Sequence, residues 1–170
     1  MISAILLRKN VKVFCFFLFI LRSLCSYTQV LPALPNVCDV RVEMPDTSGY
    51  QTLTVGAAGK DYPSLNDAIN AAQGGTVIKV DPGFYSKIIL TEKPSANDSN
   101  WIVVISSKSN LLPSGNNRIT PNALTGDVNY PTQQDAMPKV RSYGLDYALL
   151  AKTASHHYWF SGIEFTYEIT

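Results

Sequence analysis

Charge of either sign is scarce in this 170-residue sequence. Lysine and arginine total 14 against 13 for aspartate and glutamate, so the formal net charge is +1 and only 16% of residues are charged. Proteins that bind nucleic acid or an anionic membrane surface through their charge carry a basic surplus, which this chain lacks. We therefore expect no nucleic-acid partner, and the apolar fraction of 46% fits one globular domain.

Cysteine and histidine are scarce as well. The cysteines are Cys15, Cys25 and Cys38, and the two histidines are the adjacent His156 and His157. The first two cysteines fall in a predicted export signal, which leaves one cysteine in the exported chain. One cysteine excludes an internal disulfide and a metal site built from several cysteines. Neighbouring residues of a strand point to opposite faces, so we expect the two histidines not to share a metal ion.

The N-terminal residues have the composition of that export signal. A basic segment with Arg8 and Lys9 precedes an apolar run that ends at Leu21, and small residues precede a cleavage point at Ser26. A membrane-spanning helix needs roughly 20 apolar residues, more than this run provides. We therefore predict a signal peptide over 1–25 and a secreted, periplasmic or extracellular protein, free of the membrane after cleavage. A retained anchor and a lipid-modified cysteine are the alternatives.

One helix is expected near the start of the mature chain. Residues 26–51 are rich in proline and turn formers, and we interpret them as a linker or N-terminal extension. A helix is predicted over about residues 64–73, with Ser64 as its N-cap and one narrow apolar stripe. Gly74 and Gly75 then allow the left-handed turn that commonly ends a helix.

After this helix the chain consists of short β-branched runs separated by turn residues. Each run is too short for a helix, which favours strands, and no Asn-Gly hairpin turn joins them. A long aperiodic loop covers about residues 107–137, and loops of this length are often functional. The predicted strands span 52–55, 76–80, 87–90, 101–106, 139–142, 148–150, 157–160 and 163–166.

The spacing of these strands suggests a solenoid, in which each coil contributes two or three short strands and stacks on the one before. A helix at the first coil would cover its open face and its unpaired strand edge. The apolar side chains of the strands would then form one continuous interior. The residues expected to face that interior are Ile78, Val80, Ile88, Leu90, Ile102, Val104, Tyr158, Phe160, Ile163 and Phe165.

Two motifs resemble a known family. The stretch GKDYPSLNDAINAAQGGTVIKVDPGFY, from Gly59 to Tyr85, and the later ASHHYWFSGIEFT, from Ala154 to Thr166, are similar to segments of secreted right-handed parallel β-helix proteins of the pectate lyase and pectin methylesterase superfamily. The resemblance covers roughly 52–106 and 138–170. It implies an all-β fold, a right-handed parallel β-helix (a single-stranded solenoid) with an N-terminal capping α-helix. Residues 52–170 would be the N-terminal part of that domain, in a truncated chain.

The function implied by this resemblance is that of the N-terminal portion of a secreted, pectate-lyase-like protein that acts on or binds acidic polysaccharide. If the full-length protein is active, the resemblance favours a polysaccharide lyase. The family's bases and calcium-binding aspartates lie on later coils, so we expect no catalytic residue and no metal ligand here, although calcium could bind elsewhere in the full-length protein. The alternatives are a non-catalytic extracellular scaffold that binds glycan or protein, and a pectin-methylesterase-like esterase, whose motifs are absent.

A few residues are candidates for ligand contact. Strand alternation turns Tyr158 and Phe160 inward and leaves Trp159 as an outward platform on which a sugar ring could stack. Trp159 is therefore the predicted substrate-binding residue. Lys139 and Arg141 lie two apart on one strand face, as a base and a stabilising cation could, but a solvated face is the simpler interpretation.

Overall fold

The computed structural model describes residues 43–114, 117–144 and 146–168. These residues belong to one compact unit, Glu43–Thr170. The signal peptide predicted over 1–25, and the linker predicted to follow it as far as Val42, lie outside the described residues. Within the described ranges, no helix is long and apolar enough to cross a membrane.

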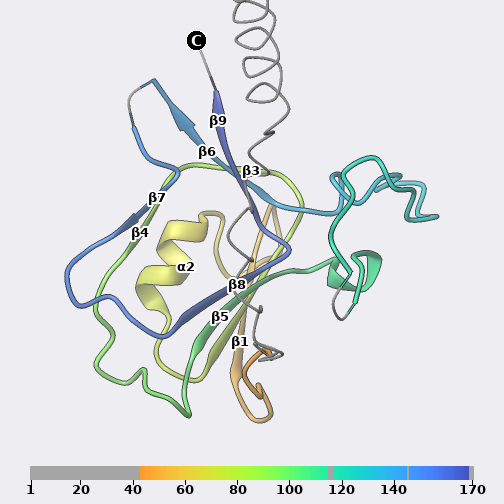
Figure 1. Ribbon diagram of the computed structural model, residues 1–170. Coiled ribbons are helices and arrows are strands. Elements are labelled where there is room, and N and C mark those ends of the chain that lie inside the picture. Colours follow the sequence, from red (N-terminus) through yellow and green to blue (C-terminus); the bar gives the residue numbers. More distant parts are fainter. Residues whose placement is uncertain (1–42, 115–116, 145, 169–170) are drawn as a thin grey trace, which may run out of the picture. The chain divides into compact units, whose positions relative to one another are not determined.

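Short strands make up most of the regular structure (Figure 1). A single α-helix lies between the first two strands of the described chain, and a short 3-10 helix, η1, follows β5. The elements are β1 (Gln51–Val55), α2 (Leu65–Ala71), β2 (Thr76–Val80), β3 (Phe84–Tyr85), β4 (Ile88–Leu90), β5 (Ile102–Ser106), η1 (Ser109–Leu111), β6 (Lys139–Tyr143), β7 (Leu149–Ala151), β8 (Tyr158–Ser161) and β9 (Glu164–Glu168).

All the strands pair in parallel, in three sheets. The strand orders are β1-β2-β5-β8, β3-β6-β9 and β4-β7. Parallel neighbours need a long connection between them. Between β1 and β2 that connection carries α2, and the later connections carry strands of the other two sheets. Between β5 and β8, for example, the chain passes through β6 and β7. The predicted β-rich fold is thus confirmed, with parallel sheets and little helix.

The strand register stacks apolar side chains in columns. Ile78 pairs with Leu53 on one side and with Val104 on the other, and Val104 pairs with Phe160. Because paired residues of parallel strands share a face, all four point into the same core. The residues predicted to face inward that are buried are Ile78, Val80, Ile88, Leu90, Ile102 and Val104, and those partly buried against the same core are Tyr158, Phe160 and Ile163.

Phe165 is the exception among the predicted core residues. It pairs with the fully buried Val140 and its ring contacts Phe160 edge-on, with centroids 5.6 Å apart. It therefore points inward, yet it stays 40% exposed. The reason is that β9 is the last strand of its sheet, so within the described chain no strand covers its outer edge.

Helix α2 begins where the sequence predicted. Ser64 has an extended backbone and its hydroxyl accepts a hydrogen bond from the Asp67 amide at 3.4 Å. Leu65, Ala68 and Ile69 are buried, and the helix packs mainly against β4. The helix ends two residues before the predicted end: it stops at Ala71 and Ala72 is extended (φ −61°, ψ 146°), while Gly75, further on, has the left-handed backbone expected of it (φ 81°).

The environment of this helix explains why it ends early. The Lys93 ammonium donates to the Asn70 carbonyl oxygen at 2.6 Å, and the Asn66 side chain accepts from the Ile89 amide at 2.9 Å. Burial lowers the pKa of Lys93 below its ordinary value. Lys93 therefore satisfies one carbonyl of the last turn that a glycine cap could otherwise satisfy, while the Asn66 side chain ties the first turn to β4.

Strand β3 was not predicted, and the long predicted loop has structure of its own. Phe84 and Tyr85, which lie outside the predicted strands, form strand β3, because they pair with Lys139 and Val140 of β6. The long loop lies between β5 and β6, as predicted, and projects away from the sheets (Figure 1). It folds back on itself through a bridge between Leu124 and Thr132.

Tyr85 anchors β3 to the preceding turn. Its hydroxyl donates to the Asp81 carbonyl oxygen at 2.8 Å. Burial raises the pKa of Tyr85 from 10.0 to about 12, and the Asp81 carboxylate adds to the rise. The folded protein favours the neutral phenol, so stability that is fully present below pH 10 is lost as the pH rises from 10 to 12.

We expect the Tyr85→Phe variant to be about 1 kcal/mol less stable than the wild type near neutral pH, because it loses this hydrogen bond. The difference should shrink as the pH rises above 10, the ordinary pKa of the group, since the variant has no phenol to ionise on unfolding. Urea unfolding of both proteins at a series of pH values measures it, with the exposed Tyr147→Phe as control. A difference that does not change with pH would contradict this prediction.

Candidate functional site

The aromatic residue predicted to bind substrate lies on β8. Trp159 is half-buried, pairs with Val103, and meets the Trp101 ring edge-on, with centroids 6.4 Å apart. Trp101 in turn meets His157 at 4.9 Å. The structure thus brings the two tryptophans together. Contact of Trp159 with a sugar stays a prediction.

The two adjacent histidines do not point apart as expected. His157 has a left-handed backbone (φ 56°) just before β8, so strand alternation does not apply to it. Its Nδ1 lies 2.5 Å from Nδ1 of His156, and its Nε2 lies 2.9 Å from Asp98 Oδ1. The three side chains form one hydrogen-bonded chain, which ties the segment before β5 to the start of β8.

A pocket of about 370 Å³ lies elsewhere, between the turn before β3 and the loop before β6. Three separate segments form it, and the pairing of β3 with β6 brings the first and the last of them together. Trp159 is not among the residues that line it. The lining residues are Pro82, Gly83, Phe84, Asn129, Tyr130, Pro131, Asp135 and Lys139.

Phe84 is the main apolar surface of the pocket, with 62% of its area exposed. It pairs with Lys139, which shares its outward face, and the outward Arg141 follows two residues later on β6. The Arg141 guanidinium carbon lies 3.2 Å from the centre of the Phe84 ring, and Lys139 Nζ lies 5.7 Å from it. Both cations therefore lie against this ring, in cation–π range.

The opposite wall of the pocket comes from the loop. Lys108 Nζ lies 5.2 Å from the centre of the Tyr130 ring. Asp135 is exposed, and the hydroxyl and amide of Thr132 donate to its carboxylate at 2.6 and 3.1 Å. The Thr132 hydroxyl, then its amide, lower the pKa of Asp135, with a smaller contribution from Lys139. Asp135 is thus an ionised hydrogen-bond acceptor at neutral pH.

The two cations on β6 are not free to act as bases. Lys139 Nζ donates to the Gln134 carbonyl oxygen at 3.0 Å, and Arg141 Nη1 lies 2.6 Å from Glu168 Oε1. The simple solvated face expected for these residues is wrong for Arg141, whose side chain is only 23% exposed. In the described part of the chain, Arg141 Nε and Glu164 Oε2 are buried without a hydrogen-bond partner.

Calcium, which the resemblance implies for the whole protein, does not fit the described residues. Among them, no group of three histidine, cysteine, aspartate or glutamate side chains could hold a metal ion. Comparisons of the chain with protein-family models, with curated proteins and with solved structures find no match. The pocket and the sequence motifs are therefore the features that bear on function.

Proposed function

We propose that the described residues from 52 onward form the first coils of a secreted right-handed parallel β-helix protein of the pectate-lyase type, with α2 as its N-terminal cap. Two observations and one general rule support this. The three parallel sheets are visited in turn by the chain, parallel crossovers are nearly always right-handed, and α2 packs beside β1 and β2. The outer edge of β1 is also occupied, since Thr54 bonds to Tyr62 and Asp61.

We further propose that the pocket beside Phe84 binds acidic polysaccharide. The observation that carries this proposal is the exposed Phe84 ring with Lys139 at its edge in a pocket of about 370 Å³. The apolar face of a sugar ring can stack on an aromatic ring, as Phe84 and Tyr130 offer. A uronate carboxylate can pair with the lysine, and Asp135 can accept hydrogen bonds from sugar hydroxyls.

The second candidate is binding without catalysis, by an extracellular scaffold. It is favoured by the bonds that hold Lys139 and Arg141, because a lyase base must be free to take a proton next to the uronate carboxylate. Asp135 is the one carboxylate that lines the pocket in the described chain, so the paired aspartates of an esterase are not present there.

The binding proposal predicts that Phe84→Ala weakens binding of polygalacturonate by about tenfold, equivalent to about 1.4 kcal/mol. Lys139→Gln should weaken it by about threefold, as expected for a partly exposed ion pair. Isothermal titration of the full chain with polygalacturonate, alginate and chondroitin measures both effects. Unchanged binding by Phe84→Ala would remove the pocket as the binding site.

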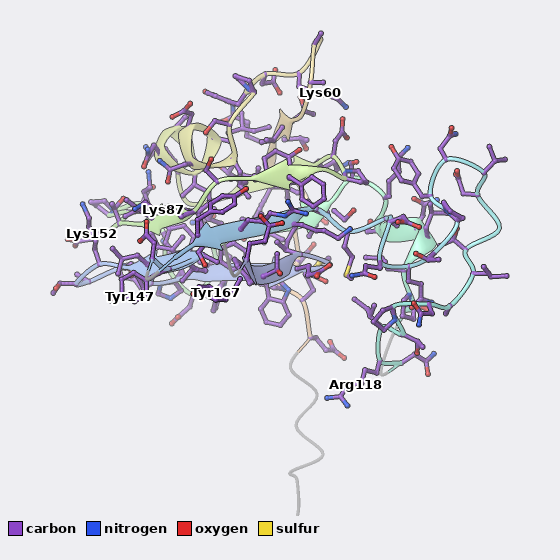
Figure 2. All side chains as sticks on the ribbon, turned by 90° about the horizontal axis from the view of Figure 1, so that it is seen from above. Lys60, Lys87, Arg118, Tyr147, Lys152 and Tyr167 are labelled. Atoms are coloured by element: carbon purple, nitrogen blue, oxygen red, sulfur yellow. The ribbon has the colours of Figure 1, made fainter. Side chains whose placement is uncertain are left out.

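Two controls make this experiment specific. Tyr147 is as exposed as Phe84, at 62%, and lies at the opposite end of the molecule from the loop that carries Arg118 (Figure 2). Tyr147→Ala should therefore bind like the wild type. Trp159→Ala tests the tryptophan pair: if it alone abolishes binding, the site lies on β8. Formation of an unsaturated product would favour the lyase, and release of methanol would favour the esterase. Binding without any product would favour the scaffold.

A further inference from the structure

Arg141 lies directly behind the Phe84 ring and outside the pocket. Its guanidinium carbon is 3.2 Å from the ring centre, yet Arg141 is not among the residues that line the pocket. We propose that Arg141 sets the charge preference of the pocket through Phe84, and so favours anionic sugars over neutral ones. This inference rests on the proposed binding function and concerns the selectivity of that same site.

The physical reason lies in the electron distribution of the ring. The face of an aromatic ring carries partial negative charge, which attracts cations and the weakly positive C–H groups of a sugar. A guanidinium on one face draws electron density toward itself. The other face then attracts neutral C–H groups less, and a carboxylate held near it is repelled less. Both changes move the preference toward an anionic ligand.

The strand order places the positive charges nearer to the Phe84 ring than the negative ones. Phe84 is on β3, the cations Lys139 and Arg141 are on β6, and the carboxylates Glu164 and Glu168 are on β9. Neighbouring strands are about 4.8 Å apart, so the cations lie closer to the ring than the carboxylates do. A ligand on Phe84 therefore meets the positive charge first.

Glu168 limits this effect because it is the partner of Arg141. Its Oε1 lies 2.6 Å from Arg141 Nη1, while Arg141 Nε is buried without a hydrogen-bond partner in the described residues. Because Glu168 lies one strand further from the ring than Arg141, its negative charge cancels only part of the effect of the guanidinium at the ring. Removing the charge of Glu168 should strengthen the preference for anionic sugars, and removing the charge of Arg141 should weaken it.

The test compares two ligands of equal length, an oligogalacturonide and its fully methyl-esterified form, which differ in the carboxylate charge and in the added ester methyl groups. The measured quantity is the ratio of their dissociation constants for the full chain. Arg141→Met keeps an unbranched stem but removes the charge, and should reduce the preference by about fivefold, equivalent to about 1 kcal/mol. Arg141→Lys keeps a cation under the ring and should retain most of it.

Glu168→Gln separates charge from packing. If Arg141 acts through its charge, Glu168→Gln should raise the preference for the acidic ligand, by about twofold, because compensation is removed. If Arg141 only supports the ring mechanically, both Arg141→Met and Glu168→Gln should weaken the two ligands equally and leave the ratio unchanged. That result would overturn the inference.

The outcomes also distinguish this inference from the binding proposal. A wild-type protein that binds neither ligand, or a Phe84→Ala variant that binds like the wild type, refutes the pocket and the inference together. If binding requires Phe84 but Arg141→Met leaves the ratio of the two dissociation constants unchanged, the inference is refuted and the binding proposal stands. Thermal melting of each variant verifies that it is folded. If Arg141→Met does not fold, the comparison is made with Arg141→Lys and Glu168→Gln instead.

Discussion

Replacing Gly74 with alanine should destabilise the protein by about 3 kcal/mol or more. A Cβ atom at this position would lie 2.2 Å from the Ser95 carbonyl oxygen and 2.7 Å from the Ala96 Cα. Both are backbone atoms, so no side-chain rotation relieves the contact. The Gly74 amide also donates to Ser95 Oγ at 2.8 Å, which holds the two segments at this distance. Accommodating a methyl group requires moving the segment before β5 away from α2.

Urea unfolding of Gly74→Ala and of a second glycine variant tests this prediction. Gly126→Ala is the matched control, because a Cβ there has no atom within 4 Å and meets only the strain of a left-handed backbone (φ 82°). That strain costs roughly 1–2 kcal/mol. If Gly74→Ala is no less stable than Gly126→Ala, the close approach of the two backbones is not a constraint.

Ile78→Ala should cost about 4 kcal/mol, the second large effect. Ile78 is fully buried and lies between Leu53 and Val104 in the central column of the largest sheet. Truncation removes apolar contacts and leaves a cavity that stacked strands cannot collapse to fill. Denaturant unfolding of the full chain gives the free-energy difference directly.

Phe165→Ala provides the comparison within the same set of inward side chains. It removes a larger side chain, yet we expect a loss of about 2 kcal/mol at most, because Phe165 is 40% exposed at the last strand of its sheet. The expected loss of stability is therefore larger for Ile78→Ala than for Phe165→Ala, although phenylalanine is the larger side chain. A larger loss for Phe165→Ala would mean that the edge of β9 is covered in solution.

The strand pattern was predictable because its causes are local. β-branched runs bounded by turn residues indicated each of the longer strands, and Thr76–Val80 was predicted with its observed bounds. The start of α2 was predictable for the same reason, since Ser64 caps it through its own side chain. The predictions of a signal peptide and of a β-helix family stay predictions.

Most of the errors share one cause, which is contact between segments distant in sequence. β3 has two residues and exists through its pairing with Lys139 and Val140. The early end of α2 depends on groups near β4, and the exposure of Phe165 depends on its place at a sheet edge. The meeting of His156 with His157 depends on a left-handed backbone that no residue pattern indicated.

The candidate site divides along the same line. The sequence by itself determined that short strands would lie before and after one capped helix, that Lys139 and Arg141 would share a strand face, and that a long loop would precede them. Only the tertiary structure decided that Phe84 lies on Arg141 and opposite Tyr130. Pairing between β3 and β6 joins residues more than fifty positions apart. The backbone hydrogen bonds between strands do not depend on side-chain identity, so neither sequence segment indicates its partner.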